Sequence, residues 1–525
     1  MTGWQALRTA GHAQLALQAA AWANPAAAQA ARWLRALHDS HTTAFGRAHG
    51  LHPDMSLADW RAAVPVRDMV GFQPWISRII AGEPRVLTAD PILAFELTGG
   101  SSGGRRAVPY TATLLDDFRA PILAWFGDLL TNCPGIAAGT AYFALSPALR
   151  TAPAPLGPYP IGLGSDLAYF GPEMAAHLGP NLLWHPSMET DNADDWAFAT
   201  AAHLVAAENL SLISVWSPTF LSRLLDQIAS DPALPQALYD GTHGLAPNPS
   251  RARQLDAARQ NGLNPNTLWP NLALISAWAD AASNRPAYAL QTRLGTIAFQ
   301  AKGLLATEGI FTLPILGLPH ALPCLTACFL EFEDANGGLH LIEELTENIP
   351  YSLIVTTGGG LQRYRIGDRV TAMGPPQMPA NWRYARPSPR LQMLQFAGRA
   401  ATCDMVGEKL TEDFVLECLA QIPGTPVLAA QQDPPARYQV WLDQAPPTPS
   451  EYLTLLDRLL RHNPQYDYAR SLCQLAPPTL HICPDLVARY TAYRLSLGHR
   501  LSDIKPPVLL APGLLHPDNW ATDTR

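Results

Sequence analysis

A cluster of glycines and hydroxyl residues, Thr98-Gly-Gly-Ser-Ser-Gly-Gly104, has the composition of a site for a polyanion. Glycines let backbone N–H groups approach an anion closely, and Thr98, Ser101 and Ser102 add hydroxyl donors. The loop lacks the Gly-Lys-[Ser/Thr] of a P-loop and the spacing of a dinucleotide-binding fingerprint. Considered alone, it therefore fits a phosphate cradle and a flexible hairpin or linker equally well.

Lysine is rare in this chain, and its positions are a second indication of chemistry. Of 36 basic residues only Lys302, Lys409 and Lys505 are lysines. Where arginine replaces most surface lysines, those that remain can mark positions that need a compact point charge and not a planar guanidinium. Survival by chance is the alternative.

The composition limits the class of protein. A chain of 525 residues is too long for one hydrophobic core, so two or three domains are expected. A net charge of −8 argues against a nucleic-acid partner. No stretch is apolar enough to span a bilayer, and the first residues lack the apolar core of a signal peptide. We expect a cytoplasmic globular protein without a membrane partner.

Seven scattered cysteines are typical of a reducing cytosol. Cys324 and Cys328, with His320 just before them, resemble part of a metal site, but no second pair lies close by to complete it. We interpret the two cysteines as small apolar residues on one face of a strand.

The glycine loop needs elements that hold it in place. A strand at 93–97 is expected to lead into it, and an amphipathic helix at 111–130 is expected to follow. Further helices are predicted at 26–38, 72–80, 196–209, 219–228 and 291–299. Further strands are predicted at 141–145, 212–216, 272–275, 302–305, 328–333, 339–342, 351–357 and 394–397. This alternation predicts an α/β body.

The chain changes character after Gly398-Arg399. A helix at 412–420, strands near 427 and at 438–442, and a helix at 450–461 form a compact α+β unit. We therefore expect a large N-terminal domain of mixed sheets and helices, 1–398, and a small C-terminal domain, 399–525.

Short strings along nearly the whole chain share the order of a known family. They include Ile79-Ile-Ala-Gly-Glu-Pro84, Ser214-Val-Trp-Ser-Pro218, Leu268-Trp-Pro270, Phe329-Leu-Glu-Phe332, Leu353-Ile-Val-Thr-Thr357, Tyr364-Arg-Ile-Gly-Asp368, Asn463-Pro-Gln-Tyr466 and Ser502-Asp-Ile-Lys-Pro506. With the glycine loop and Ala306-Thr-Glu308, they make the sequence similar to the Gretchen Hagen acyl acid amido synthetases, as a bacterial-type member. This family belongs to the acyl-adenylate-forming superfamily.

The resemblance implies ATP-dependent activation of a carboxylic acid, followed by transfer of the acyl group to the amine of an amino acid. Family members form an acyl-adenylate, release pyrophosphate and need Mg²⁺. The C-terminal domain of the superfamily is mobile, so the resemblance places a hinge near 398–406.

The resemblance also assigns roles to residues of this chain. Glu308 would bind the metal and take part in catalysis, because carboxylate oxygen suits Mg²⁺. Asp368 would accept hydrogen bonds from the ribose hydroxyls. Lys505 would stabilise charge as the carboxylate attacks the α-phosphate. The other expected ATP-binding residues are Thr98, Ser101, Ser102, Gly103, Gly104, Thr307, Phe396 and Arg399. Lys409 would help with phosphate or hinge contacts, and Lys302 would be structural.

Two departures from the family pattern bear on the acid. Plant members usually carry Tyr-Ala-Ser-Ser-Glu where this chain has Leu304-Leu-Ala-Thr-Glu308, and the glycine loop differs too. We expect the acyl pocket to be lined by Trp125, Tyr169 and Trp216, with Ser165 and Phe220 nearby. Such an aromatic pocket favours an aryl or hydrophobic acid.

Two other functions remain possible from the sequence alone. An adenylate-forming ligase could pass the acyl group to a thiol, and a nucleotide-binding protein could lack turnover altogether. Loss of Lys505, Glu308 or Asp368 would indicate the latter, and all three are present. The expected partners are therefore small molecules: a carboxylic acid, an amino acid and ATP.

Overall fold

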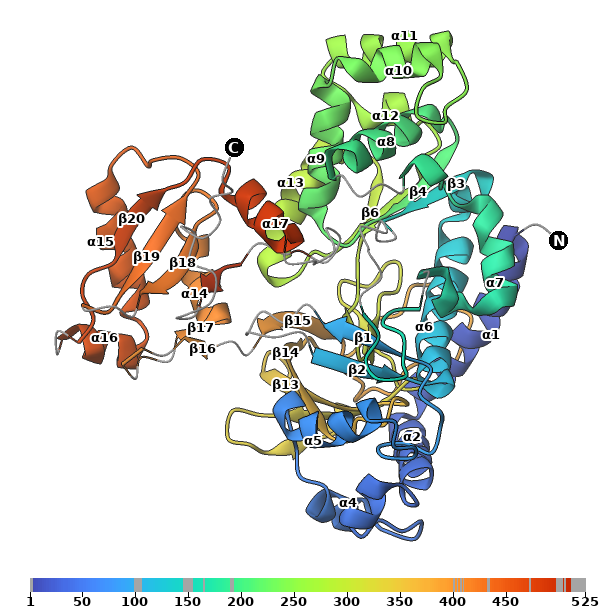
Figure 1. Ribbon diagram of the computed structural model, residues 1–525, viewed down its shortest axis with the longest axis vertical. Coiled ribbons are helices and arrows are strands. Elements are labelled where there is room, and N and C mark those ends of the chain that lie inside the picture. The colour runs from blue at the N-terminus through green and yellow to red at the C-terminus, as the bar shows by residue number, and fades with distance from the viewer. Residues whose placement is uncertain are drawn as a thin grey trace.

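The computed structural model arranges the chain around three main β-sheets (Figure 1). It describes residues 3–98, 106–144, 154–163, 166–188, 193–399, 402–403, 405–406, 408, 410–431, 435–471, 474–496, 504 and 507–510. A four-stranded parallel sheet and a five-stranded antiparallel sheet precede residue 400, and a four-stranded mixed sheet follows it. The predicted α/β class, a large body followed by a small α+β part, is confirmed.

Helices at the N-terminal end begin where local signals predict. They are α1 (Gly3–Ala23), α2 (Pro25–Ser40), α3 (Ala44–Ala48), α4 (Leu57–Ala63), α5 (Met69–Ile80) and, further along, α6 (Ala112–Asn132). At the start of α2 the Asn24 side chain accepts a hydrogen bond from the Ala27 N–H, and Pro25 occupies the first turn. Helices α1 and α6 lie side by side at Gly11 and Gly127, where a Cβ atom on Gly11 would lie 2.5 Å from the Gly127 nitrogen. Only glycine permits this approach.

The parallel sheet has the order β3-β4-β5-β6. Its strands are β3 (Thr140–Phe143), β4 (Leu210–Ser214), β5 (Leu274–Ala277) and β6 (Ala298–Ala301). Successive side chains point to opposite faces, so Leu212 and Leu274 pack toward α6 while Ile213 and Ile275 face the other way. The second face is covered by α8 (Ala193–Ala206), α9 (Pro218–Ser230), α10 (Ala233–Asp240), α11 (Pro249–Gln260), α12 (Pro265–Leu268) and α13 (Asn284–Leu294).

The antiparallel sheet has the order β12-β11-β13-β14-β15. Its strands are β11 (Phe329–Glu333), β12 (Leu339–His340), β13 (Pro350–Thr356), β14 (Tyr364–Ala372) and β15 (Leu394–Arg399). Buried and partly buried residues alternate along the whole of β14, so one face of this strand packs on the core. Three hairpins accompany the sheets: β1 (Ala94–Thr98) with β2 (Arg106–Tyr110), β7 (Leu305–Ala306) with β8 (Gly309–Ile310), and β9 (Thr312–Leu313) with β10 (Leu322–Pro323).

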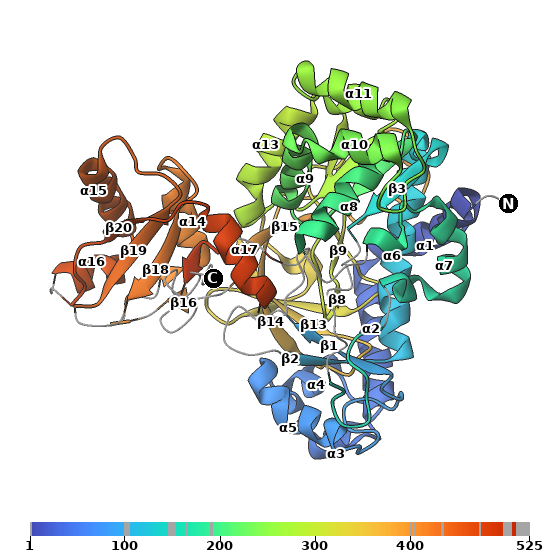
Figure 2. The ribbon, with the colours of Figure 1, turned by 45° about the horizontal axis from the view of Figure 1, so that its top comes forward.

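The C-terminal part has its own core, which includes Leu428, Val440 and Leu456. Its sheet has the order β20-β19-β18-β21. Its elements are β16 (Thr402–Cys403), β17 (Leu410–Thr411), α14 (Glu412–Ala420), β18 (Val427–Gln431), β19 (Arg437–Leu442), α15 (Pro449–Leu460), α16 (Pro464–Ser471), β20 (Thr479–Ile482), α17 (Leu486–Ser496) and β21 (Leu509–Leu510). In Figures 1 and 2, α17 lies on the side of this sheet that faces the rest of the chain. The Arg285 guanidinium donates to the Gly424 carbonyl at 2.5 Å and joins the two parts.

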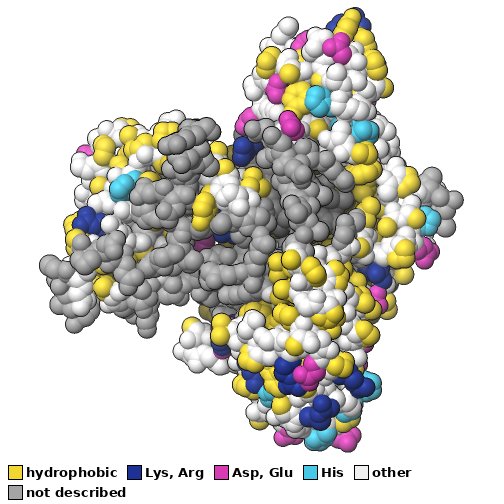
Figure 3. Space-filling model, viewed as in Figure 1, with side chains coloured by type: hydrophobic (Ala, Val, Ile, Leu, Met, Phe, Trp, Pro, Cys, Tyr) yellow, Lys and Arg dark blue, Asp and Glu magenta, His cyan; other side chains and the backbone are white. Residues whose placement is uncertain are grey.

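The remaining short elements connect these layers. They are α7 (Gly171–Leu178) and the 3-10 helices η1 (Pro134–Ala138), η2 (Asp166–Phe170), η3 (Gly179–Asn181), η4 (Pro186–Met188), η5 (Ala281–Ser283) and η6 (Ile342–Glu344). No helix within the described ranges is long and apolar enough to cross a membrane. On the face shown in Figure 3, basic and acidic side chains gather together at the end where α4 and α5 lie.

Two predicted segments near residue 300 are wrong. The helix expected at 291–299 is α13, which stops at Gly295, where the left-handed backbone (φ +64°) ends it. The strand expected at 302–305 lies earlier, at Ala298–Ala301, so Lys302 follows the end of a strand. The hydrophobic pattern of residues 291–305 has no clear period, so it does not distinguish a short helix from a short strand.

The interpretation of the cysteine pair is half right. Cys324 and Cys328 are buried apolar residues, and burial raises the pKa of both thiols. Neither lies in a strand, however, because Cys324 follows β10 and Cys328 precedes β11. The described part of the chain contains no cluster of three potential metal ligands.

A buried ion pair ties three distant segments together. Glu331 of β11 is fully buried and accepts from the Arg363 Nε at 2.9 Å and from the Arg61 Nε at 2.8 Å. The Arg363 guanidinium also donates to the Val64 carbonyl at 2.6 Å and to the Arg61 carbonyl at 2.8 Å. Glu331 therefore holds Arg363 in place against α4.

Replacing Glu331 with glutamine should destabilise the protein strongly. The Arg363 charge would remain buried without its counter-charge, at a cost of about 3–5 kcal/mol in the free energy of unfolding. Urea unfolding followed by tryptophan fluorescence would measure it. The matched control is Asp226→Asn, which removes an exposed pair with Arg293 and should cost less than about 1 kcal/mol. Equal costs for the two variants would contradict the prediction.

Candidate active site

A tight turn presents the predicted metal-binding carboxylate. Thr307 and Glu308 form the two-residue turn of the β7–β8 hairpin. The Glu308 side chain is buried, and the Tyr364 hydroxyl donates to its Oε1 at 3.1 Å. Tyr364 begins β14 and is itself buried, so the hydrogen bond fixes the carboxylate relative to the antiparallel sheet. A carboxylate and a neighbouring hydroxyl are the hard oxygen donors that Mg²⁺ prefers.

A second hydrogen-bond chain holds the same turn from the side of α6. The Tyr110 hydroxyl donates to the Thr307 carbonyl at 2.6 Å and accepts from the Tyr169 hydroxyl at 3.2 Å. Both phenol rings pack on Phe118 of α6. Burial, with smaller effects of Tyr169 and of the Glu96 and Glu308 carboxylates, raises the pKa of Tyr110. Tyr110 therefore remains a neutral donor.

Asp368 lies inside β14, and a bulge sets its direction. Gly367 has a left-handed backbone (φ +90°), and the ladder between β14 and β15 shifts between Asp368 and Val370. Such a bulge re-aims the neighbouring side chain. Asp368 is only 2% exposed and lies four residues from Tyr364 on one strand. Strand β14 thus carries Asp368 itself and, through the Tyr364 hydroxyl, orients Glu308.

The expected ATP-binding residue Phe396 lies where the two sheets of the N-terminal part meet. Phe396 of β15 is partly buried, and its backbone N–H donates to the Asp280 carboxylate at 3.3 Å. The Gln395 side chain donates to the same carboxylate at 3.2 Å. Asp280 comes shortly after β5, so it links β15 to the carboxyl edge of the parallel sheet. We did not predict Asp280, although an acidic residue just after a buried strand is a detectable signal.

The predicted acyl-pocket residues separate into two groups. Trp125 of α6 and Trp216 lie on either side of the Lys302 ammonium, whose nitrogen is 5.2 and 5.1 Å from the two ring centroids. Tyr169 instead joins Tyr110 near Thr307. Phe220, expected nearby, is buried in the core and stacks on Trp196 at 5.4 Å. Helix α9 thus turns Phe220 toward the helical layer, and its expected place near the acid stays a prediction.

Several predicted residues lie outside the described part of the chain. They are Ser101, Ser102, Gly103, Gly104, Ser165, Lys409 and Lys505. Thr98 and Arg399 end β1 and β15, and Thr98 pairs with Arg106, so the glycine loop connects the strands of a hairpin. The roles of these residues stay predictions.

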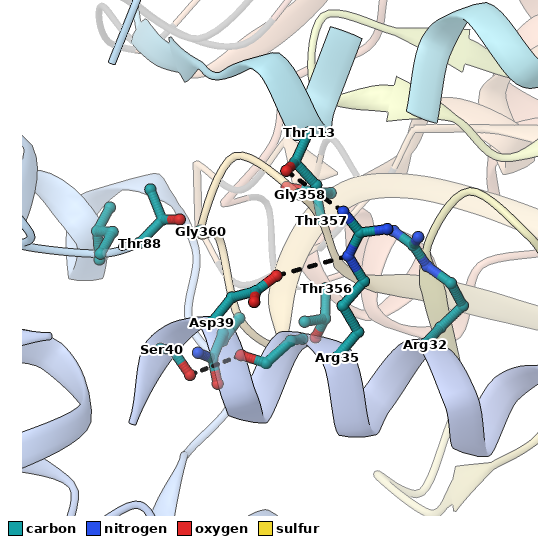
Figure 4. A pocket seen from close by; sticks show the side chains of 13 residues that line it. Arg32, Arg35, Asp39, Ser40, Thr88, Thr113, Thr356, Thr357, Gly358 and Gly360 are labelled. Atoms are coloured by element: carbon teal, nitrogen blue, oxygen red, sulfur yellow. Dashed lines mark hydrogen bonds and ion pairs between the residues drawn. The ribbon is translucent and has the colours of Figure 1, made fainter. Parts of the chain in front are cut away.

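A narrow cavity of about 20 Å³ lies elsewhere, between α2 and the Thr357–Gly360 turn (Figure 4). Arg35 reaches across it from Asp39 to the Thr113 hydroxyl, at 3.6 and 3.4 Å. This volume holds about one water molecule, far less than a nucleotide needs. We therefore do not regard the cavity as the active site.

Comparison with known proteins defines the class. A structure of AtGH3.15 acyl acid amido synthetase in complex with 2,4-DB superposes with a TM-score of 0.80 at 17% identity, over 96% of this chain and 95% of that chain. A second GH3.15 acyl acid amido synthetase structure gives 0.78 at 16% identity, over 95% and 94%. A 2-hydroxyisobutyryl-CoA ligase with bound 2-HIB-AMP gives 0.51 at 12% identity, over 92% and 88%. The fold is therefore that of the adenylate-forming ligases.

Family models make the identification specific. The GH3 family N-terminal domain matches residues 15–289, and the GH3 family central domain matches residues 322–383. The first match alone spans more than half of the 525 residues. The chain belongs to the GH3 family. A sequence search of curated proteins gave no match.

Replacing Gly367 with alanine should test the bulge at Asp368. No atom lies within 4 Å of the position a Cβ would take, so the cost comes from the left-handed backbone alone, about 1–2 kcal/mol of unfolding free energy. Gly337, in the turn between β11 and β12, has φ +81° and equally open space, and is the matched control. Urea unfolding should show similar losses for both alanine variants, while calorimetry should show weaker ATP binding only for Gly367→Ala. Unchanged stability of Gly367→Ala would contradict this account.

Proposed function

We propose that the chain is an ATP-dependent acyl acid amido synthetase. It activates a carboxylic acid as an acyl-adenylate and passes the acyl group to the amine of an amino acid. The observation that supports this most directly is the arrangement of Glu308 and Asp368 around β14, in a chain of the GH3 family. An AMP-forming acid–amino acid ligase needs both a metal-binding and a ribose-binding carboxylate near one nucleotide.

The nucleotide would lie between the β1–β2 hairpin and the meeting point of the two sheets. Asp368 would accept from the ribose hydroxyls, and Phe396 would pack beside the base. Backbone N–H groups and hydroxyls of 98–104 would donate to the β- and γ-phosphates, with Arg399 as a further phosphate contact. Glu308 would hold Mg²⁺, which when bound would neutralise charge on the phosphates, and Thr307 would contact ATP.

The chemistry proceeds in two displacements. An oxygen of the substrate carboxylate attacks the α-phosphate, and the bond to the β-phosphate breaks as pyrophosphate leaves with the electron pair. An amino group then attacks the acyl carbon, loses a proton and displaces AMP. Lys505 would stabilise the charge on the α-phosphate in the first step.

Lys505 lies in the C-terminal part, so that part must approach the nucleotide. We take residues 1–398 as an N-terminal adenylation domain and 399–525 as a mobile C-terminal domain. Strand β15 ends at Arg399 and β16 begins at Thr402, which is a short connection suited to a hinge.

Two alternatives to this function exist. The enzyme could transfer the acyl group to a thiol, or the protein could bind the nucleotide without turnover. The presence of Glu308, Asp368 and Lys505 argues against the latter. None of the six described cysteines forms a disulfide, which fits the cytoplasmic location we propose.

Replacing Lys505 with alanine should lower the rate of acid-dependent ATP–pyrophosphate exchange at least about a hundredfold, because the transition-state charge loses its partner. ATP binding, measured by calorimetry, should change little. Arg458→Ala, which removes an exposed cation from α15, is the control and should exchange normally. Wild-type exchange by Lys505→Ala would overturn the role of the lysine. Mass spectrometry of a panel of acids crossed with amino acids and coenzyme A would identify the acceptor.

Replacing Tyr364 with phenylalanine should raise the Mg²⁺ concentration for half-maximal exchange about tenfold or more, because Glu308 loses the donor that orients it. Tyr351→Phe is the matched control. Tyr351 is also buried in the antiparallel sheet, and its hydroxyl accepts from the Thr346 N–H at 3.0 Å. An unchanged Mg²⁺ requirement in Tyr364→Phe would argue that Glu308 is oriented by other groups.

A further inference from the structure

Two neighbouring strands of the parallel sheet end in nearly the same sequence. Leu212-Ile-Ser-Val-Trp216 and Leu274-Ile-Ser-Ala-Trp278 differ at one position. The strands are in register, since Ser214 pairs with Ser276. Because alternate side chains share a face, both serines lie toward α6, one step beyond the apolar row of Leu212 and Leu274.

The third strand extends this row. Gln300 of β6 pairs with Ser276, so Ser214, Ser276 and Gln300 form one polar row across the carboxyl edge of the sheet. Trp125 of α6 covers the row and donates from its indole nitrogen to the Gln300 Oε1 at 2.8 Å. Lys302 follows two residues later, on the same face. Ligands of α/β sheets bind at this edge.

Lys302 has no counter-charge among the described residues. Its ammonium donates to the Ser214 Oγ at 2.7 Å and lies over the Trp125 and Trp216 rings. Among the described residues no carboxylate lies within ion-pair distance of it, and Ser214 is its one hydrogen-bond acceptor. An ammonium has three N–H donors. Burial lowers the pKa of Lys302 to about 7, because the surroundings penalise the charged form.

Two further donors of the row are unused. The Ser276 Oγ and the Gln300 Nε2 are buried, and neither has a hydrogen-bond partner in the described structure. The side chains are 0% and 6% exposed. The indole N–H of Trp125 can only donate, so the Gln300 oxygen must face it. The Gln300 amide nitrogen then points elsewhere and has no acceptor in the described structure. Unpaired buried donors are costly, so a ligand that accepts from them would repay their cost.

The row lies at the end of the expected acyl pocket that is remote from the Thr307–Glu308 turn. Phe118 packs with Tyr110 and Tyr169, which reach Thr307, whereas Trp125 packs on Lys302. Phe118 and Trp125 are seven residues apart on one face of α6, a distance of roughly 10 Å along the helix. This span suits one ring or a short chain with oxygen groups at both ends.

We propose that Lys302, with the Ser214–Ser276–Gln300 row, determines substrate specificity by binding a second oxygen acceptor at the far end of the acid. The inference rests on the proposed function. The substrate class is an acid with a flat or apolar middle and a remote carboxylate or phenolic oxygen. The ammonium and the unused donors bind that oxygen, and Trp125 and Trp216 flank it. Ser214 positions Lys302.

The test compares acids that differ only at the far end. Calorimetry with the full-length chain would measure binding of phenylacetate, 4-hydroxyphenylacetate and 4-carboxyphenylacetate, and of hexanoate and adipate. We expect the wild type to bind at least one oxygen-bearing acid tenfold or more tightly than its unsubstituted partner. A preference confined to 4-carboxyphenylacetate and adipate identifies a carboxylate, and one confined to 4-hydroxyphenylacetate identifies a phenol. Equal affinities throughout would overturn the proposal.

Lys302→Met should remove that preference, with a loss of about tenfold to a hundredfold for the preferred acid and little change for its partner. Lys302→Arg should retain part of it. Arg251→Met is the matched control, since Arg251 is a buried cation whose donors reach the Val205 and Leu268 carbonyls. It should lower stability but leave the ratio of affinities unchanged. If Lys302 were purely structural, Lys302→Met would likewise lower stability and leave the ratio of affinities unchanged. That result would contradict the proposal.

Ser276→Ala tests the row without changing Lys302, so its result does not depend on whether the fold tolerates a substitution of the lysine. It removes a hydroxyl without a partner, so the melting temperature should not fall, while affinity for the preferred acid should. A lower melting temperature with an unchanged affinity ratio would overturn the role of the row. Binding preference without pyrophosphate exchange would retain the inference and refute the proposed function. Pyrophosphate exchange with many acids, without a preference that depends on Lys302, would retain the proposed function and refute the inference.

Discussion

The buried ion pair between Glu331 and Arg363 is the constraint on which the candidate site depends. A buried guanidinium needs a counter-charge and acceptors for its donors, and Arg363 obtains them from β11 and α4. It does so with a left-handed backbone (φ +51°), which few arginines adopt. The next residue, Tyr364, then donates to Glu308. The geometry of the Thr307–Glu308 turn is thereby coupled to the contacts that Arg363 makes with β11 and with residues 61–64.

The site uses the edges of two different sheets. Tyr364, Asp368 and Phe396 of the proposed site lie on the antiparallel sheet, and the row that ends at Lys302 lies on the parallel sheet. Asp280 connects them, because it follows a parallel strand and accepts hydrogen bonds from β15. In the function we propose, the nucleotide and the acid would therefore be held on separate rigid supports.

Buried polar groups distinguish the two halves of the site. Around Glu308 each tyrosine hydroxyl has a protein partner, so that region is preorganised without a ligand. Around Lys302, Ser276 and Gln300 retain donors without partners. Such groups reduce stability unless a ligand satisfies them, which is the usual relation between specificity and stability in binding sites.

The sequence by itself determined the fold class, the family resemblance and most strands and helices. Those depend on local periodicity and on short motifs that keep their order, as in Thr111–Leu130 and Tyr364–Asp368. It failed at 291–305, where a glycine, and not a change in hydrophobic period, separates helix from strand. It also did not foresee that Lys302 lies over the Trp125 and Trp216 rings, or that Phe220 stacks on Trp196. Only the tertiary structure decided these, because strand register and helix rotation, which bring Lys302 between two distant tryptophans, are set by packing over long separations in the chain.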